Sequence, residues 1–203
     1  MSVITFPSTL HIMKQTWGST RLDTKFESVF GTQAVEVNPP LWTSTLESDQ
    51  LNENVSGAWS AFIMQMKGQT NQLALWNLGR PVPLGTMRGT MTFNTTAIQG
   101  ATTLSIIAST ESTKTLKAGD YLGFGATVTQ QVVMVMADAT ANGSGIISVT
   151  VQPPLRNAMA ATTAITWDKP TAFFRQKQGA VSWEYTETFA SGFSLDLIED
   201  WRP

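Results

Sequence analysis

Turn signals between β-rich runs are the feature that most constrains how this chain can fold. Residues 116–155 contain an Ala-Gly-Asp turn at 118–120 and an Asn-Gly turn at 142–143, each followed by a run rich in β-forming residues. The stretch ends at Pro153 and Pro154, which cannot donate to a sheet ladder. Asn-Gly between apolar runs is a strong short-range signal for a hairpin. The pattern predicts consecutive antiparallel strands at the centre of a small β-barrel.

Short strand candidates continue on both sides of this stretch at fairly regular spacing, which is typical of a barrel or sandwich. The outer flanks are also β-patterned, and neither is complete alone. We therefore expect a mainly β protein in which a small barrel, residues 87–168, is inserted into a split β domain formed by residues 1–86 and 169–203. The strand candidates of the barrel are residues 91–93, 103–107, 121–124, 131–136, 146–151 and 164–167.

The first flank is predicted to contain three or four strands followed by one helix. A turn at residues 17–20 would fold the first two strands into a hairpin, and Asn38, Pro39 and Pro40 would end a later strand. The helix follows from the spacing of four apolar residues that would share one face. Asn54 or Ser56 would cap its start and Gly68 would end it. The four apolar residues are Trp59, Phe62, Ile63 and Met66.

The second flank supplies three further strand candidates, at residues 171–175, 179–189 and 192–201. In the last of these, alternate residues from Phe193 to Trp201 would form one face. Glu199 and Asp200 would point to opposite faces, so we expect this acidic cluster to face solvent or a partner subunit. The strands need a sheet to join, which the first flank provides.

The composition excludes several functional classes. The net charge of −2 lacks the clustered lysine and arginine that hold nucleic acid. The chain has no cysteine and one histidine, His11, so thiolate chemistry, cysteine-bound zinc and histidine-pair metal sites are excluded. No nucleophile elbow, phosphate loop or dinucleotide fingerprint is present. We expect no enzymatic activity, no catalytic residue, no metal and no cofactor.

The start of the chain lacks the basic region and long apolar run of a signal peptide, and Pro7 would interrupt such a run. No apolar run approaches the ~20 residues that a membrane helix needs. We therefore expect a soluble protein without a cleaved secretion signal and without membrane contact.

Seven tryptophans raise a carbohydrate-binding alternative, because aromatic faces stack on sugar rings. Five of them fall in predicted strands or on the apolar helix face, where burial is the better explanation. Trp17 and Trp167 are the two that the pattern commits least to a core.

The layout resembles the distal tail protein, or tail hub component, of long-tailed bacteriophages. The resemblance covers most of the chain: an N-terminal β domain with one helix, a barrel inserted after a Pro/Gly loop, and closing strands. Its most specific local matches are the Leu-Lys-Ala-Gly-Asp-Tyr run at 116–121, Pro-Pro-Leu-Arg at 153–156, and Asp-Lys-Pro-Thr-Ala-Phe-Phe-Arg at 168–175.

The resemblance implies a structural virion protein that is assembled in the host cytoplasm. It implies a homohexameric ring that joins the tail tube protein to the tail-tip or baseplate hub protein, with DNA only as passing cargo. It also implies an oligonucleotide/oligosaccharide-binding (OB) or galectin-like barrel, which in some relatives holds a receptor-binding protein or sugar. The ring would form through the split domain, so the subunit-interface candidates are Trp17, Arg21, Trp42, Trp183, Tyr185 and Trp201. The alternative is a β-rich carbohydrate-binding module of an adhesion apparatus.

Overall fold

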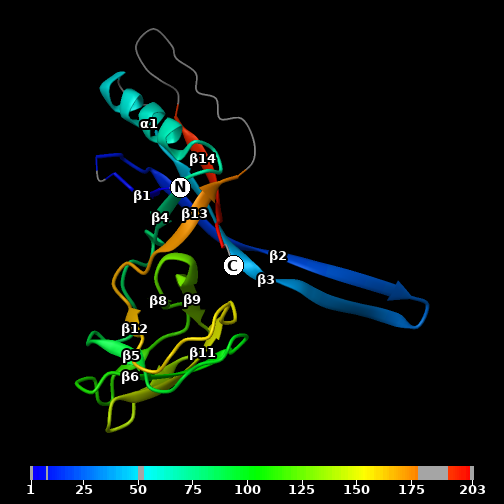
Figure 1. The fold of residues 1–203 in the computed structure, drawn as a ribbon, viewed down its shortest axis with the longest axis vertical. Helices are drawn as coiled ribbons and strands as arrows, with labels where there is room; N and C mark the ends of the chain where they lie inside the picture. The colour runs from blue at the N-terminus through cyan, green and yellow to red at the C-terminus, as the bar shows by residue number, and fades with distance from the viewer. Residues whose placement is uncertain (1, 8, 50–52, 178–191, 202–203) are drawn as a thin grey trace. The chain divides into compact units, whose positions relative to one another are not determined.

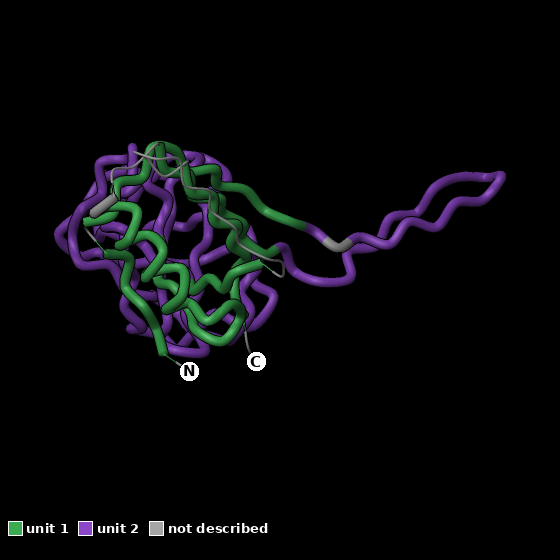
Figure 2. Tube along the Cα trace, turned by 90° about the horizontal axis from the view of Figure 1, so that it is seen from above, with its two compact units in different colours: residues 1–20, 41–75, 173–201 green, residues 21–40, 76–172, 202–203 purple. Residues whose placement is uncertain are grey.

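The computed structural model describes residues 2–7, 9–49, 53–177 and 192–201 (Figure 1). These residues are mainly β, with one α-helix, α1 (Glu53–Met66). They divide into two compact units (Figure 2). Unit 1 consists of residues 1–20, 41–75 and 173–201, and unit 2 contains residues 21–40 and 76–172.

A six-stranded sheet organises unit 1, in the order β1-β4-β13-β14-β3-β2. β1 runs parallel to β4, whereas β14 is antiparallel to both β13 and β3. β2 and β3 are much longer than the other strands and extend into unit 2. The strands are β1 (Val3–Thr5), β2 (Lys14–Ser28), β3 (Gly31–Glu47), β4 (Gln72–Leu75), β13 (Ala172–Gln176) and β14 (Ser194–Glu199).

Helix α1 packs through the apolar face that the sequence predicts. Trp59 is fully buried, and its ring stacks on Phe193 with centroids 6.0 Å apart. Phe6 meets Trp59 and Phe62 edge-on. Alternate residues of β14, and alternate residues of β3 from residue 40 onward, complete this core. Such alternation is typical of a strand with one buried face.

A closed antiparallel barrel forms most of unit 2, in the order β11-β6-β5-β12-β8-β9, with β9 pairing back to β11. Its interior is filled by apolar side chains from every strand, including Phe93, Phe124 and Val149. The strands are β5 (Met91–Phe93), β6 (Thr103–Ile107), β8 (Tyr121–Phe124), β9 (Gln131–Val135), β11 (Ile146–Gln152) and β12 (Ala164–Thr166). The small barrel predicted from the turn spacing is confirmed, and all six predicted strands take part in it.

Two further short strands, β7 (Thr115–Leu116) and β10 (Ala139–Thr140), pair with each other beside the barrel. A 3-10 turn, η1 (Thr127–Thr129), links β8 to β9. The Asn-Gly turn before β11 is held by Asn142, whose side-chain oxygen accepts N–H bonds from Ser144 and Ile146.

The predicted turn at residues 17–20 is wrong, because β2 runs through it without a break. Gly18 lies beside the Thr43 side chain on the neighbouring strand, so this glycine is part of the strand pair and not of a turn. The predicted stop at Pro39 and Pro40 is also wrong, since β3 is one strand. β14 pairs only with residues 43–47 of β3, so these two prolines interrupt no ladder with β14.

Two smaller expectations are also corrected. Helix α1 begins at Glu53, so Asn54 and Ser56 lie inside the helix and do not cap it. Glu199 and Asp200 are buried and do not face solvent. Glu199 accepts a hydrogen bond from the backbone N–H of Trp42 at 3.0 Å. The predicted strand at residues 179–189 lies outside the described residues.

Candidate functional site

The most distinctive surface is the part of the β2–β3 hairpin that lies in unit 2, residues 21–40, here called the arm. In β3, every residue from 31 to 38 is exposed, whereas from residue 39 to the end of the strand half-buried and buried positions alternate. At one end the two strands therefore contribute half-buried residues in β2 and buried residues in β3, and at the other end their described residues are exposed on both faces.

Cross-strand contacts far from the turn and at the turn itself share one register. The side chain of Gln15 donates to Ser44 Oγ at 3.3 Å, and the rings of Trp17 and Trp42 lie 5.8 Å apart. Both pairs are placed symmetrically about a two-residue turn at positions 29 and 30. A constant register of this kind lets the alternation of side chains be followed from the sheet into the arm.

One face of the arm is charged. It continues the face of Trp17 and Trp42 and carries the odd-numbered residues of β2 and the even-numbered residues of β3. Arg21 Nη1 lies 3.5 Å from Glu36 Oε1, and Lys25 pairs with Glu27. Exposed pairs of this kind contribute about 0–1 kcal/mol each. Their main effect is to keep this face hydrated.

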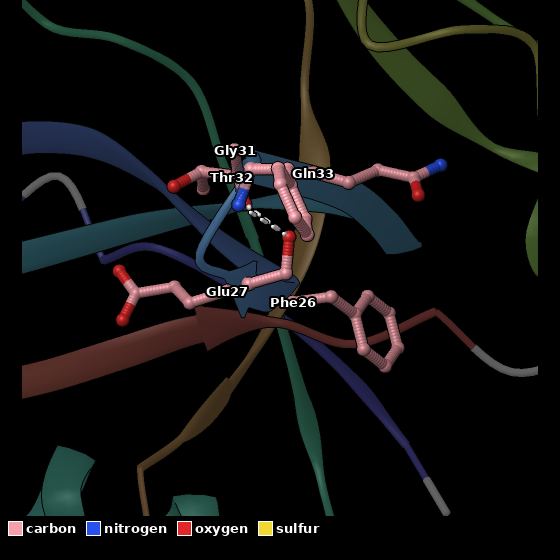
Figure 3. A pocket seen from close by; sticks show the side chains of 7 residues that line it. Phe26, Glu27, Gly31, Thr32 and Gln33 are labelled. Carbon is pink, nitrogen blue, oxygen red and sulfur yellow. Dashed lines mark hydrogen bonds between the residues drawn. The ribbon is translucent and has the colours of Figure 1, made fainter.

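The opposite face of the arm is apolar. Phe26 is 60% exposed, Val35 44% and Val37 52%. Figure 3 shows that the side chains of Phe26 and Gln33 extend to one side of the hairpin and that of Glu27 to the other. Exposed apolar side chains gathered on one face of a strand pair are typical of a surface that a partner covers.

The tip of the arm adds two more apolar side chains, Val29 at 97% exposure and Phe30 at 100%. Ser28 Oγ accepts the N–H of Phe30 and donates to the carbonyl of Gly31, both at 3.2 Å, which closes the turn. A hollow of about 350 Å³ lies beside this turn, lined by Phe26, Phe30 and neighbouring residues. Turns usually consist of Gly, Asn, Asp, Ser and Pro, so the Val-Phe turn is unusual.

The sequence-predicted interface residues occupy different surroundings. Arg21 lies on the charged face of the arm. Trp17 is half-buried against Trp42 and Phe174, and Trp42 is only 6% exposed. Trp201 is half-buried. The other two candidates, Trp183 and Tyr185, lie outside the described residues.

Sequence reasoning missed the apolar side chains of the arm, because it divided β2 at residue 18 and β3 at residue 39. The signal that could have found them is an apolar dipeptide, Val29 and Phe30, placed at the centre of two alternating runs of similar length. Such symmetry about a turn is typical of a long hairpin.

The described tryptophans offer little surface for sugar stacking. None of the six is exposed. Arg88 lies over the ring of Trp167, and Lys169 lies over that of Trp76. Among the described large apolar side chains, two aromatic rings are exposed. They belong to Phe26 and Phe30, and both lie on the arm.

No catalytic or metal-binding geometry stands out in the part of the chain that the structure describes. No group of three His, Asp or Glu side chains lies close enough to hold a metal ion there.

Burial raises the pKa of Tyr121, against the opposing effects of a hydrogen bond with the Asn77 side chain and the charge of Arg80. No described helix has the length and apolar character needed to cross a bilayer.

Comparison with known protein families finds no family model that matches the chain, and comparison with curated proteins finds no match.

Proposed function

We propose that this protein is a structural ring protein of a bacteriophage tail, which joins the tail tube to the tail-tip or baseplate hub. The observation that carries the proposal is the arm, a long hairpin with one charged face, one apolar face and an apolar tip. In the ring, the arm of each subunit lies on the next subunit. DNA passes through the ring without being held.

The arm fits this role in size and chemistry. A standard protein interface buries about 800 Å² per partner and involves about 20–30 residues a side, which is the scale of residues 21–40. Such interfaces combine an apolar centre with a polar rim. The apolar centre here is supplied by Phe26, Phe30, Val35 and Val37, and the rim by the charged residues of the other face.

The position of β2 gives a second reason. Among the described strands, β2 ends the sheet order and has one neighbour, β3. An edge strand presents backbone N–H and C=O groups to which another chain can add a strand. An arm that docks on a different surface of the next copy forms a head-to-tail contact, and such contacts generate a closed ring when the rotation between neighbouring copies closes.

The charge of the chain is consistent with a DNA channel. The net charge of −2 gives no excess of cations to hold phosphates, and DNA moves freely along a surface that binds it weakly. The carbohydrate-binding alternative has less support, since none of the described tryptophans is exposed.

The native mass of the purified chain tests the proposal. Light scattering over a wide concentration range, with negative-stain images of each fraction, should show hexamers that appear as closed rings. A strict monomer at every concentration, both alone and after mixing with tail tube and hub proteins, would contradict it.

A further inference from the structure

We propose that Asn142 is a site of spontaneous modification, at which the side-chain amide is lost and an aspartate or isoaspartate forms. Asparagine is among the thermolabile residues of proteins. Asn142 and Gly143 are the one Asn-Gly pair in the sequence, and they lie in the turn between β10 and β11 of unit 2. Both residues, and Ser144 after them, are exposed. The reaction needs only water, and the inference does not rest on the proposed ring.

The turn fixes the orientation of the Asn142 amide. The backbone N–H groups of Ser144 and Ile146 both donate to the same side-chain atom, at 2.9 Å and 3.0 Å. Two N–H donors can share an oxygen but not the amide nitrogen, which is itself a donor. The shared atom is therefore Oδ1. Within the described residues Nδ2 has no acceptor, so the group that must leave is open to water.

The nucleophile is the backbone nitrogen of Gly143. Within the part of the chain that the structure describes, its N–H donates to no acceptor, whereas the other N–H groups of residues 142–146 are all bonded. Nothing lies within 4 Å of the position that a Cβ would occupy at Gly143. Hydroxide can therefore remove the proton from this nitrogen, and no side chain shields it.

The reaction balances without an oxidant or a reductant. The deprotonated nitrogen of Gly143 attacks Cγ of Asn142, a C–N bond forms, and the negative charge of the intermediate collects on Oδ1. The bond from Cγ to Nδ2 then breaks, and ammonia leaves with a proton taken from water. The product is a cyclic imide. Water opens this imide on one side to give aspartate and on the other side to give isoaspartate.

The hydrogen bonds of the turn favour the attack on Cγ. N–H groups that already point at an oxygen stabilise negative charge as it develops there, and they need no reorganisation to do so. The N–H groups of Ser144 and Ile146 have this position at Oδ1. The aspartate product would keep both hydrogen bonds with a charged acceptor, which strengthens them. Isoaspartate instead adds a methylene to the main chain and lengthens the turn before β11.

Asn77 provides a comparison within the same chain. Its Oδ1 accepts the backbone N–H of Gly79 at 2.9 Å, so its side chain is also held in a turn. The residue that follows it, however, is Leu78 and not a glycine. The side chain of Leu78 hinders attack by its own backbone nitrogen, so Asn77 should stay intact under conditions that convert Asn142.

Peptide mapping of the folded full chain by mass spectrometry, after incubation in mildly alkaline buffer, tests the proposal. Asn142 should gain the mass difference between a hydroxyl and an amino group. The gain should be faster in alkaline than in mildly acidic buffer, because the Gly143 nitrogen must lose a proton. We expect Asn142 to react about tenfold faster in the folded chain than in the chain unfolded by urea, since even one N–H donor aimed at developing charge has at least this effect.

Gly143→Ala should slow the reaction about tenfold, which corresponds to about 1.4 kcal/mol in the barrier. Gly143 does not have a positive φ and a Cβ there meets nothing, so the unfolding temperature should not change. Ser144→Ala is the matched control, because it changes an exposed side chain of the same turn and keeps the backbone N–H; it should react like the wild type.

Four results would overturn the proposal. They are no mass gain at Asn142 in the folded chain, an equal or faster reaction in the unfolded chain, an equal gain at Asn77, and an unchanged rate in Gly143→Ala.

Discussion

Replacing both phenylalanines of the arm, Phe26→Ser with Phe30→Ser, should weaken self-association without unfolding the chain. Phe30 is 100% exposed and Phe26 is 60% exposed, so a partner can remove nearly all of one ring and more than half of the other from water. Full burial of a phenylalanine contributes about 1.5–3 kcal/mol. The pair therefore contributes roughly 2–5 kcal/mol per contact, which corresponds to about 30-fold to 4,000-fold in the dissociation constant.

The assay is native mass by light scattering over a dilution series, with thermal unfolding measured in parallel. Because both side chains are exposed within one chain, their replacement should change the free energy of unfolding by less than about 0.5 kcal/mol. The control is Ile98→Ser with Val128→Ser, which removes two apolar side chains of similar exposure, 72% and 62%, from outside the arm. If the arm variant assembles at the same concentration as the wild type, or if the control dissociates equally, the arm does not carry the contact.

Three further outcomes follow from the interior and from one surface pair. Asp120→Ala leaves three backbone N–H groups without their acceptor, so we expect the free energy of unfolding to fall by about 3 kcal/mol. The unfolding temperature, measured by circular dichroism, should fall by roughly 10 °C, whereas Asp168→Ala should leave it unchanged. Trp59→Ala should cost about 3–5 kcal/mol in denaturant unfolding, because this ring is fully buried; a loss below 1 kcal/mol would contradict the packing described. The hydrogen bond from Lys117 lowers the pKa of Asp138 below 3.8, so the stabilisation from this pair is present above that value and is lost as the pH falls through the lower, folded-state pKa. A carboxyl titration followed by NMR should show that midpoint and its return toward 3.8 in Lys117→Met.

The barrel could be predicted from the sequence because its signals are local. Each strand is short, its apolar residues alternate, and the turns between strands carry recognisable residues such as the Asn-Gly of positions 142 and 143. The helix could be predicted for the same reason, since Trp59, Phe62 and Met66 recur at helical spacing and are all buried.

The arm could not be predicted from local signals because two of them point the wrong way. Gly18 resembles a turn residue, yet it lies in the middle of β2 against Thr43. Pro39 resembles a strand stop, yet β3 continues through it. The buried role of Glu199 was missed for a related reason: its partner, the N–H of Trp42, is distant in the sequence, and only the assembled sheet brings them together.

The support of the loop that contains Pro81 and Pro83 could not be predicted from the sequence either. Pro81 and Pro83 indicated a loop, which is correct, but the fixing of that loop depends on Asp120 from a turn distant in the chain. A carboxylate that serves as a structural acceptor has the same appearance in a sequence as one that faces solvent.

The exposed hairpin has a consequence for the chain on its own. Long strand pairs with an open edge and an apolar face are templates for cross-β aggregation. The ion pairs of Arg21 with Glu36 and of Lys25 with Glu27 oppose such aggregation. If two arms stacked face to face, these charged side chains would lose their contact with water, which costs free energy. Pro39 and Pro40 have no N–H to donate, so a strand from another chain cannot form a continuous hydrogen-bonded ladder along the whole of β3. These charges and prolines therefore oppose the pairing of one exposed arm with another.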